Sequence, residues 1–310
     1  MQRPRRGDSV FRGLTAGAGA LVVLLIGAIA VFLIVQATPA LRAAGAGFFS
    51  RFEWFPDATP ARFGVAALAF GTVVSSLLAL VLAVPIAIGS ALFTTEIAPP
   101  RLGRWIGHLM DLLAAVPSVV YGLWGVAFLV PRLVPAQEWL DRVLGFIPIF
   151  HSRNGTYGRS LFAASVVLAI MVLPIIAAIS REVFRQAPMT HREAAMALGA
   201  TRWETIRYAV LPFSRSGLIG AAMLGLGRAL GETIAVALVL AASFQINWHL
   251  VEPGGNTIAA NIATKFGEAG LLGREALIAS GLVLFAITLA VNIAARAVVN
   301  RTARLAGARP

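Results

Sequence analysis

Residues Gly217–Ser243 read GLIGAAMLGLGRALGETIAVALVLAAS, and they are the most informative part of the sequence. The segment is apolar enough to cross a bilayer, yet it holds Arg228 and Glu232. An arginine at the centre of a membrane helix costs roughly 2.5–3.5 kcal/mol on insertion scales, so such charges usually have a function. The i, i+4 spacing predicts that both side chains share one helical face and partly neutralise each other. We therefore expect a membrane-spanning transport protein whose path is lined by this face.

The composition of the whole chain also indicates a protein embedded in a lipid bilayer. Hydrophobic residues make up 58% of the sequence, charged residues 13%, and the mean hydropathy is +0.81, whereas about 25% of residues are charged in soluble domains. The net charge of +12 comes from arginines scattered through short segments, which favours membrane topology over nucleic acid as its cause. The chain has no cysteine, and its four histidines are not paired at metal-ligand spacing, so no metal site is expected.

Six apolar stretches approach the ~20 residues that span the hydrocarbon core. They are Ala18–Val35, Val65–Phe93, Leu109–Val130, Leu161–Ile179, Gly217–Ser243 and Ala276–Ala295. The sequence thus predicts an all-α, polytopic membrane protein with six transmembrane helices. Pro85, Pro117 and Pro174 fall inside these spans, where neighbouring helices tolerate kinks.

The distribution of basic residues predicts the orientation of these spans. With both termini in the cytoplasm, sixteen of the 26 Arg and Lys residues lie inside and nine outside, while Arg228 is intramembrane. The expected organisation is a cytoplasmic tail over 1–17, a permease domain over 18–299 and a second cytoplasmic tail over 300–310. Aromatic rings before the second span are expected to form an interfacial belt, with partner docking as the alternative: Phe48, Phe49, Phe52, Trp54 and Phe55.

The long loop Arg181–Ser216 is where coupling to another protein is expected. Glu193–Leu198 favours a helix, Gly199 interrupts it, and Trp203–Leu211 favours a second helix that ends before Pro212. This compact knob is either a docking element for another protein or an ordinary surface hairpin, and the residues alone leave both open.

Residues of this loop, about 188–212, resemble the EAA loop of ABC-importer permeases. The matching residues are Glu193, Ala194, Ala195, Gly199, Leu211 and Pro212. Ala209 stands where the family pattern has isoleucine, a departure that leaves the helix–Gly–helix layout intact. The resemblance implies that the loop carries a coupling helix for a cytoplasmic ATPase.

Two further stretches resemble the PstC-type permease subunits of bacterial phosphate importers: AAVPSVVYGLWG at Ala114–Gly125 and GRALGETIAV at Gly227–Val236. The resemblance covers nearly the whole chain and implies a MetI-like permease fold in the inner membrane. It also implies three kinds of partner, namely a PstA-type homologous permease, a PstB-type ATPase dimer and a PstS-type external phosphate-binding protein.

The chain lacks the P-loop pattern of a nucleotide motor, because its single lysine, Lys265, is followed by Phe266. We therefore expect no cofactor on this chain, ATP and Mg on the partner ATPase, and no enzymatic activity.

The predicted substrate is an oxyanion, inorganic phosphate by resemblance. Gly227 and Gly231 flank Arg228 in a G-x-x-x-G pair that permits close approach of a neighbouring helix. The guanidinium fork suits phosphate oxygens, and Glu232 is expected to hold Arg228 while the path is empty. A permanent structural ion pair is the alternative. The competing functions are a permease for sulfate or molybdate, an intramembrane lipid-phosphate enzyme, for which no nucleophile or base is visible, and a secondary transporter.

Overall fold

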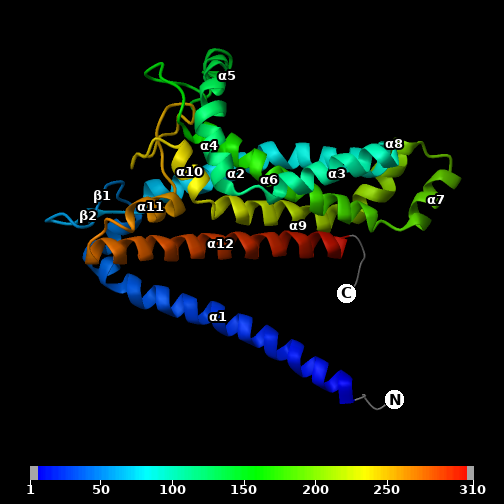
Figure 1. The fold of residues 1–310 in the computed structure, drawn as a ribbon, viewed down its shortest axis with the longest axis horizontal. Helices are drawn as coiled ribbons and strands as arrows, with labels where there is room; N and C mark the ends of the chain where they lie inside the picture. The colour runs from blue at the N-terminus through cyan, green and yellow to red at the C-terminus, as the bar shows by residue number, and fades with distance from the viewer. Residues whose placement is uncertain (1–5, 306–310) are drawn as a thin grey trace.

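A computed structural model describes residues 6–305, which are mainly helical (Figure 1). The α-helices are α1 (Arg6–Ala44), α2 (Ala66–Leu92), α3 (Pro100–Ala115), α4 (Ser118–Trp124), α5 (Val130–Leu144), α6 (Leu161–Arg185), α7 (Met189–Ala197), α8 (Arg202–Thr205), α9 (Leu211–Leu230), α10 (Ile234–Val239), α11 (Ile258–Lys265) and α12 (Leu271–Leu305). Short 3-10 or π segments extend some of them: η1 (Gly45–Phe49), η2 (Phe93–Ile97), η3 (Gly125–Leu129) and η4 (Ile206–Val210). Two strands, β1 (Trp54–Phe55) and β2 (Arg62–Phe63), pair antiparallel.

Six helical runs are long and apolar enough to cross a membrane, as the sequence predicts. They are Phe11–Phe49, Ala66–Ile97, Ser118–Leu144, Leu161–Arg185, Arg202–Leu230 and Leu271–Ala297. Helices α2, α6, α9 and α12 lie along one common axis, while α5 stands across it and α1 diverges from the bundle towards its N-terminal end (Figure 1).

The centre of the bundle is the packing of α2 against α6. The α2 side of this contact is built from small residues at a four-residue spacing, Ala79, Ala83 and Ala87, all fully buried. Small residues let two backbones approach closely, which is how membrane helices gain packing energy without a hydrophobic effect between them. Helix α9 packs on α6 in the same way, since Gly225 lies directly against Ile176.

The third predicted span is not continuous, and its boundaries were wrong. Helix α3 ends at Ala115, and Val116 adopts an extended conformation with ψ 129° before α4 begins at Ser118. The cause is Pro117, because the helical region is sterically disfavoured for the residue before a proline. The apolar run of spanning length is Ser118–Leu144 instead. By contrast, Pro85 and Pro174 lie within α2 and α6, as predicted.

The aromatic segment before α2 forms a small folded cap instead of a simple interfacial belt. Phe48 and Phe63 are fully buried, and Trp54 is stacked on Phe244 with ring centroids 6.3 Å apart. The belt prediction was therefore wrong for Phe48 and Trp54. Only the remaining rings, Phe49, Phe52 and Phe55, are exposed.

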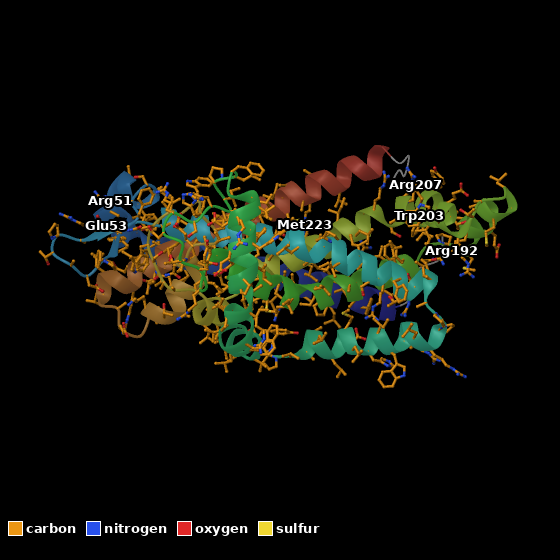
Figure 2. The ribbon with its side chains drawn as sticks, turned by 90° about the horizontal axis from the view of Figure 1, so that it is seen from above. Arg51, Glu53, Arg192, Trp203, Arg207 and Met223 are labelled. Carbon is orange, nitrogen blue, oxygen red and sulfur yellow. The ribbon has the colours of Figure 1, made fainter. Side chains whose placement is uncertain are left out.

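The two ends of the molecule carry different elements. Helix α7, α8, the start of α1 and the end of α12 lie at one end, and the β1–β2 hairpin lies at the other (Figure 1). Arg192, Trp203 and Arg207 mark the first end in Figure 2, and Arg51 and Glu53 the second. We call these the α7 end and the hairpin end.

Helix α1 begins at Arg6, so it extends into the predicted cytoplasmic tail 1–17. Residues 1–5 and 306–310 of the two predicted tails lie outside the described residues.

Candidate functional site

The predicted fifth span is interrupted beside its two charged residues. Helix α9 ends at Leu230, Gly231 follows with φ −91° and ψ 0°, and the short helix α10 starts only at Ile234. The Glu232 side chain stabilises this break, because its Oε1 accepts a hydrogen bond of 3.3 Å from the Ala235 backbone N–H. The expectation of one helix through Ser243 was wrong, since this carboxylate satisfies a free amide at the start of α10.

Arg228 and Glu232 consequently do not share one helical face. Within residues 6–305 the ion pairs joined at 4.0 Å or less do not include this pair. Glu232 is buried at 7% exposure, whereas Arg228 is exposed. The prediction that Arg228 and Glu232 form a neutralising ion pair was therefore wrong for this conformation. The exposed guanidinium of Arg228 faces an open space next to α9.

That space is a cavity of about 770 Å³ that both residues line. Its wall comes mainly from one face of α9, with Ile175 of α6 and two polar residues of α12, Asn292 and Arg296. Helices α9 and α12 lie side by side and run in opposite directions (Figure 1). Arg296 therefore lies one helical turn closer to the α7 end than Asn292.

Asn292 and Arg296 were missed by the sequence reasoning, which counted Arg296 only as a basic residue of the cytoplasmic side. The available signal was their i, i+4 spacing on the last span, the same spacing that drew attention to Arg228 and Glu232. Two guanidinium groups and one amide in one cavity form an electropositive lining suited to an oxyanion.

The glycines beside Arg228 leave this cavity open. A Cβ added to Gly227 would meet no heavy atom within 4 Å. The same holds for Gly220, which lies two helical turns earlier on the same face of α9. Gly231 also lines the cavity. No helix in the described part of this chain packs against Gly227, so the close approach predicted from the G-x-x-x-G pair is not made within these residues.

At the α7 end, the structure has the helix–Gly–helix layout that the loop sequence predicts. Gly199 ends α7 with φ +82°, a left-handed conformation that glycine adopts without strain. The turn is closed by a 3.1 Å bond from the Ala200 N–H to the Ala195 carbonyl. Glu193 and Ala194 are exposed, and Leu198 is 90% exposed. The knob thus presents an uncovered surface that mixes charge and apolar area.

The second helix of the loop does not end before Pro212, which corrects the prediction. Helix α8, η4 and α9 are continuous, and Leu211 and Pro212 form the first turn of α9. The Leu211 N–H bonds to the Ile206 carbonyl, a five-residue π turn. This widened turn accommodates a proline inside a helix, because proline has no N–H and its ring needs space beside the preceding turn.

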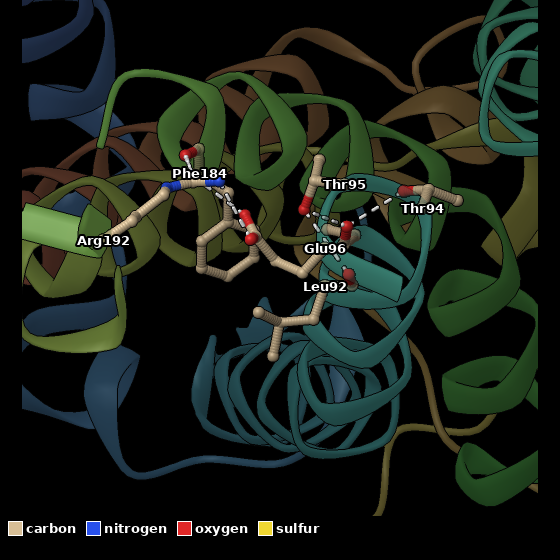
Figure 3. A network of polar contacts seen from close by, with 7 residues as sticks. Leu92, Thr94, Thr95, Glu96, Phe184 and Arg192 are labelled. Atoms are coloured by element: carbon tan, nitrogen blue, oxygen red, sulfur yellow. Dashed lines mark hydrogen bonds and ion pairs between the residues drawn. The ribbon is translucent and has the colours of Figure 1, made fainter. Parts of the chain in front are cut away.

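An ion pair that sequence reasoning missed ties the knob to the membrane helices (Figure 3). Arg192 on α7 donates two hydrogen bonds to Glu96 in η2, of 3.0 Å and 2.9 Å, and a third to the Phe184 carbonyl on α6. Both side chains are largely buried, at 18% and 9% exposure. A bidentate pair fixes relative orientation as well as distance, so α7 and the ends of α2 and α6 are held as one unit.

The comparisons with known proteins agree with this architecture. The family described as binding-protein-dependent transport system inner membrane component matches residues 83–304. The chain is 47% identical over 303 residues to phosphate transport system permease protein PstC 2 of Mycobacterium tuberculosis, covering 96% of this chain and 93% of the relative. It is 48% identical over 300 residues to the PstC permease of Mycobacterium leprae, covering 95% and 93%.

A solved bacterial ABC transporter, described as importing the acidic polysaccharide alginate, has the same fold. The TM-score is 0.51 at 16% identity, with 94% of this chain and 99% of that chain covered. The relatives are named as transport permeases, in agreement with the expectation that this chain is not an enzyme. The chain belongs to the family of binding-protein-dependent transport inner-membrane components and, within it, to the PstC permeases.

Proposed function

We propose that this chain forms one half of the translocation path of an ATP-driven importer of inorganic phosphate. The observation that carries the proposal is the exposed guanidinium of Arg228 in a cavity between membrane helices, with no carboxylate of the described chain bound to it. The names of relatives that match nearly the full chain support phosphate as the substrate.

Phosphate crosses the membrane along the wall of the Arg228 cavity. Arg228 offers a planar fork of donors to the phosphate oxygens, and Asn292 and Arg296 offer further donors towards the α7 end. Glu232 lines the same cavity, so its negative charge keeps the anion from being held too tightly. Binding that is favourable yet weak is what conduction through a path requires.

The knob transmits the conformational change of the ATPase to the helices that line the translocation path. The exposed surface around Glu193, Ala194 and Leu198 seats on an ATPase of the PstB type, which binds ATP and Mg and works as a dimer. Movement of α7 is passed to α2 and α6 through the Arg192–Glu96 pair and the bond to Phe184. Alternating access follows from rocking of these helices.

We also propose an orientation and two further partners, based on the elements at the two ends of the molecule. The α7 end faces the cytoplasm, which places both termini there, and the hairpin end faces the external phosphate-binding protein of the PstS type. The cavity beside α9 opens on the seam with a homologous permease of the PstA type.

The test is ATP-driven uptake of radiolabelled phosphate by the complete complex in reconstituted vesicles, with sulfate as competitor. We expect Arg228→Gln to lower the uptake rate at least tenfold, while the matched variant Arg274→Gln on α12, outside the cavity, transports normally. Undiminished uptake by an assembled Arg228→Gln complex refutes the path. Competition by sulfate at equal concentration refutes the choice of phosphate over other oxyanions.

A further inference from the structure

A second basic cavity, distinct from the one at Arg228, lies between α3 and α6 near the α7 end. It measures about 440 Å³ and is lined by residues from both helices: Arg104, Gly107, His108, Asp111, Arg181 and Arg185 among them. A smaller hollow of about 260 Å³ adjoins it, since Arg104 and His108 line both, and adds Arg101 and Trp105. Neither hollow is used by the transport path proposed above.

Buried polar side chains form the floor of the larger cavity. Arg181 is 8% exposed and donates a 2.7 Å hydrogen bond from Nη2 to Asp111 Oδ1. Its buried Nε has no hydrogen-bond partner among the residues that the structure describes. Asp111 therefore satisfies this buried guanidinium only in part, and positive charge remains at the floor of the hollow. Gly107 makes room for the arginine, because a Cβ there would lie 2.1 Å from Arg181 Nη1.

Positive charge exceeds negative charge around the two hollows. Four guanidinium groups, those of Arg101, Arg104, Arg181 and Arg185, meet only two carboxylates, Asp111 and Glu182. Asp111 is engaged by Arg181, and Glu182 faces Gln186 at 3.5 Å. Arg104 and Arg185 are exposed, with ends available to a ligand. The group that suits this charge balance and donor geometry is a phosphate.

The surroundings identify the source of that phosphate as a lipid. Trp105 is 69% exposed beside the basic residues, and Leu109 and Leu112 are 50% and 66% exposed further along α3. Indole rings favour the headgroup depth of a membrane, and exposed leucines favour acyl chains. A basic hollow with an exposed apolar helical surface beside it, at one end of a membrane bundle, is the arrangement that holds an anionic lipid headgroup.

We propose that the α3–α6 hollow binds the headgroup phosphate of an anionic phospholipid, with Arg104 and Arg185 as its outer ligands, Arg181 at its floor and Trp105 at its rim. The bound lipid strengthens the contact between α3 and α6. The Arg181–Asp111 ion pair joins the same two helices at the floor of the hollow. This site does not depend on the substrate of the importer.

The experiment measures the thermal midpoint of the purified complete complex in detergent against added lipid. Dioleoylphosphatidylglycerol is the anionic probe, dioleoylphosphatidylcholine the neutral one, and inorganic phosphate the free anion. We expect a saturable rise in the midpoint with phosphatidylglycerol and none with phosphatidylcholine, while any rise with inorganic phosphate comes from the transport path and does not depend on Arg104 and Arg185. Arg104→Gln combined with Arg185→Gln should raise the half-saturating lipid concentration about tenfold or more, since each basic group near a membrane surface contributes appreciably to anionic-lipid binding.

Both substituted residues are exposed and leave the Arg181–Asp111 pair intact, so the double variant is expected to fold. Arg132→Gln, at an exposed arginine of α5 outside the hollow, is the matched control and should keep the wild-type lipid response. An unchanged half-saturating concentration in the double variant overturns the site. An equal response to phosphatidylcholine, or a response to inorganic phosphate that the Arg104→Gln, Arg185→Gln variant loses, overturns the assignment of an anionic lipid.

Discussion

Removing the charge of Glu96 should loosen the coupling knob without unfolding the membrane bundle. Glu96→Gln keeps the size of the side chain but breaks the bidentate pair with Arg192, whose two bonds are 3.0 Å and 2.9 Å long. Breaking a fully buried pair costs about 3–5 kcal/mol. Here Arg192 keeps 18% exposure and its bond to Phe184, and glutamine retains one acceptor, so we expect about 2 kcal/mol.

The assay is amide hydrogen exchange of the reconstituted complex, read at the turn that closes α7. The Leu198, Gly199 and Ala200 amides are bonded to carbonyls of the same helix, so they report its opening. A loss of about 2 kcal/mol corresponds to roughly 30-fold faster exchange. ATP hydrolysis should continue while phosphate uptake falls, because the knob no longer moves α2 with it.

The control is Glu268→Gln, which breaks the exposed pair with Lys265 at 3.7 Å and should leave exchange at α7 unchanged. Arg192→Gln added to Glu96→Gln should cost little beyond the larger single effect, as expected for two partners of one interaction. Exchange at α7 that rises less than threefold in a folded Glu96→Gln complex would refute the reasoning.

Three further predictions concern the knob and the outer segments. Gly199→Trp forces a bulky residue into φ +82° and should abolish coupling while the complex still assembles, measured as uptake per ATP hydrolysed; normal coupling would contradict it. Arg159→Gln removes hydrogen bonds to the Leu238, Val239 and Leu240 carbonyls at the end of α10. Amide hydrogen exchange just after Leu240 should become roughly fivefold faster, which corresponds to a loss of about 1 kcal/mol in local stability. Burial raises the pKa of Glu252, but hydrogen bonds from Asn247 and the Arg153 backbone outweigh it and hold the pKa below its ordinary 4.5. The stabilisation by ionised Glu252 is therefore complete above pH 4.5 and lost as the pH falls through the lower folded-state pKa, so intrinsic-rate-corrected exchange at residues 153–154 should rise there in wild type but not in Glu252→Gln.

The sequence was most informative where a property is carried by a continuous stretch. Hydropathy predicted the number of spans, because each needs about 20 apolar residues whatever it packs against, although it misplaced the ends of the third and fifth. The turn at Gly199 was also predictable, since glycine after a helical run is a local signal. Neither inference requires knowledge of distant contacts.

The errors concern residues whose behaviour depends on local competition or on distant partners. Arg228 and Glu232 were expected to pair, but the Glu232 carboxylate satisfies the free Ala235 amide and α9 ends before it. Glu96 and Arg192 are far apart in the sequence, so their pairing could not be read from spacing. Arg296 joins the cavity of Arg228 because α12 packs beside α9, a tertiary contact that spacing along the sequence does not reveal.

The charge of the Arg228 cavity and its accessibility to anions can be measured with a single cysteine placed on its wall. The chain has no cysteine, so Gly220→Cys introduces one reactive thiol on the cavity wall, where a Cβ meets nothing within 4 Å. In a complete complex whose other chains lack reactive cysteines, a negatively charged methanethiosulfonate should modify this thiol faster than a positively charged one, and phosphate supplied during ATP turnover should slow the reaction. Arg228→Gln should remove both effects. A thiol that does not react, or that reacts with the same charge preference in the Arg228→Gln background, contradicts the account.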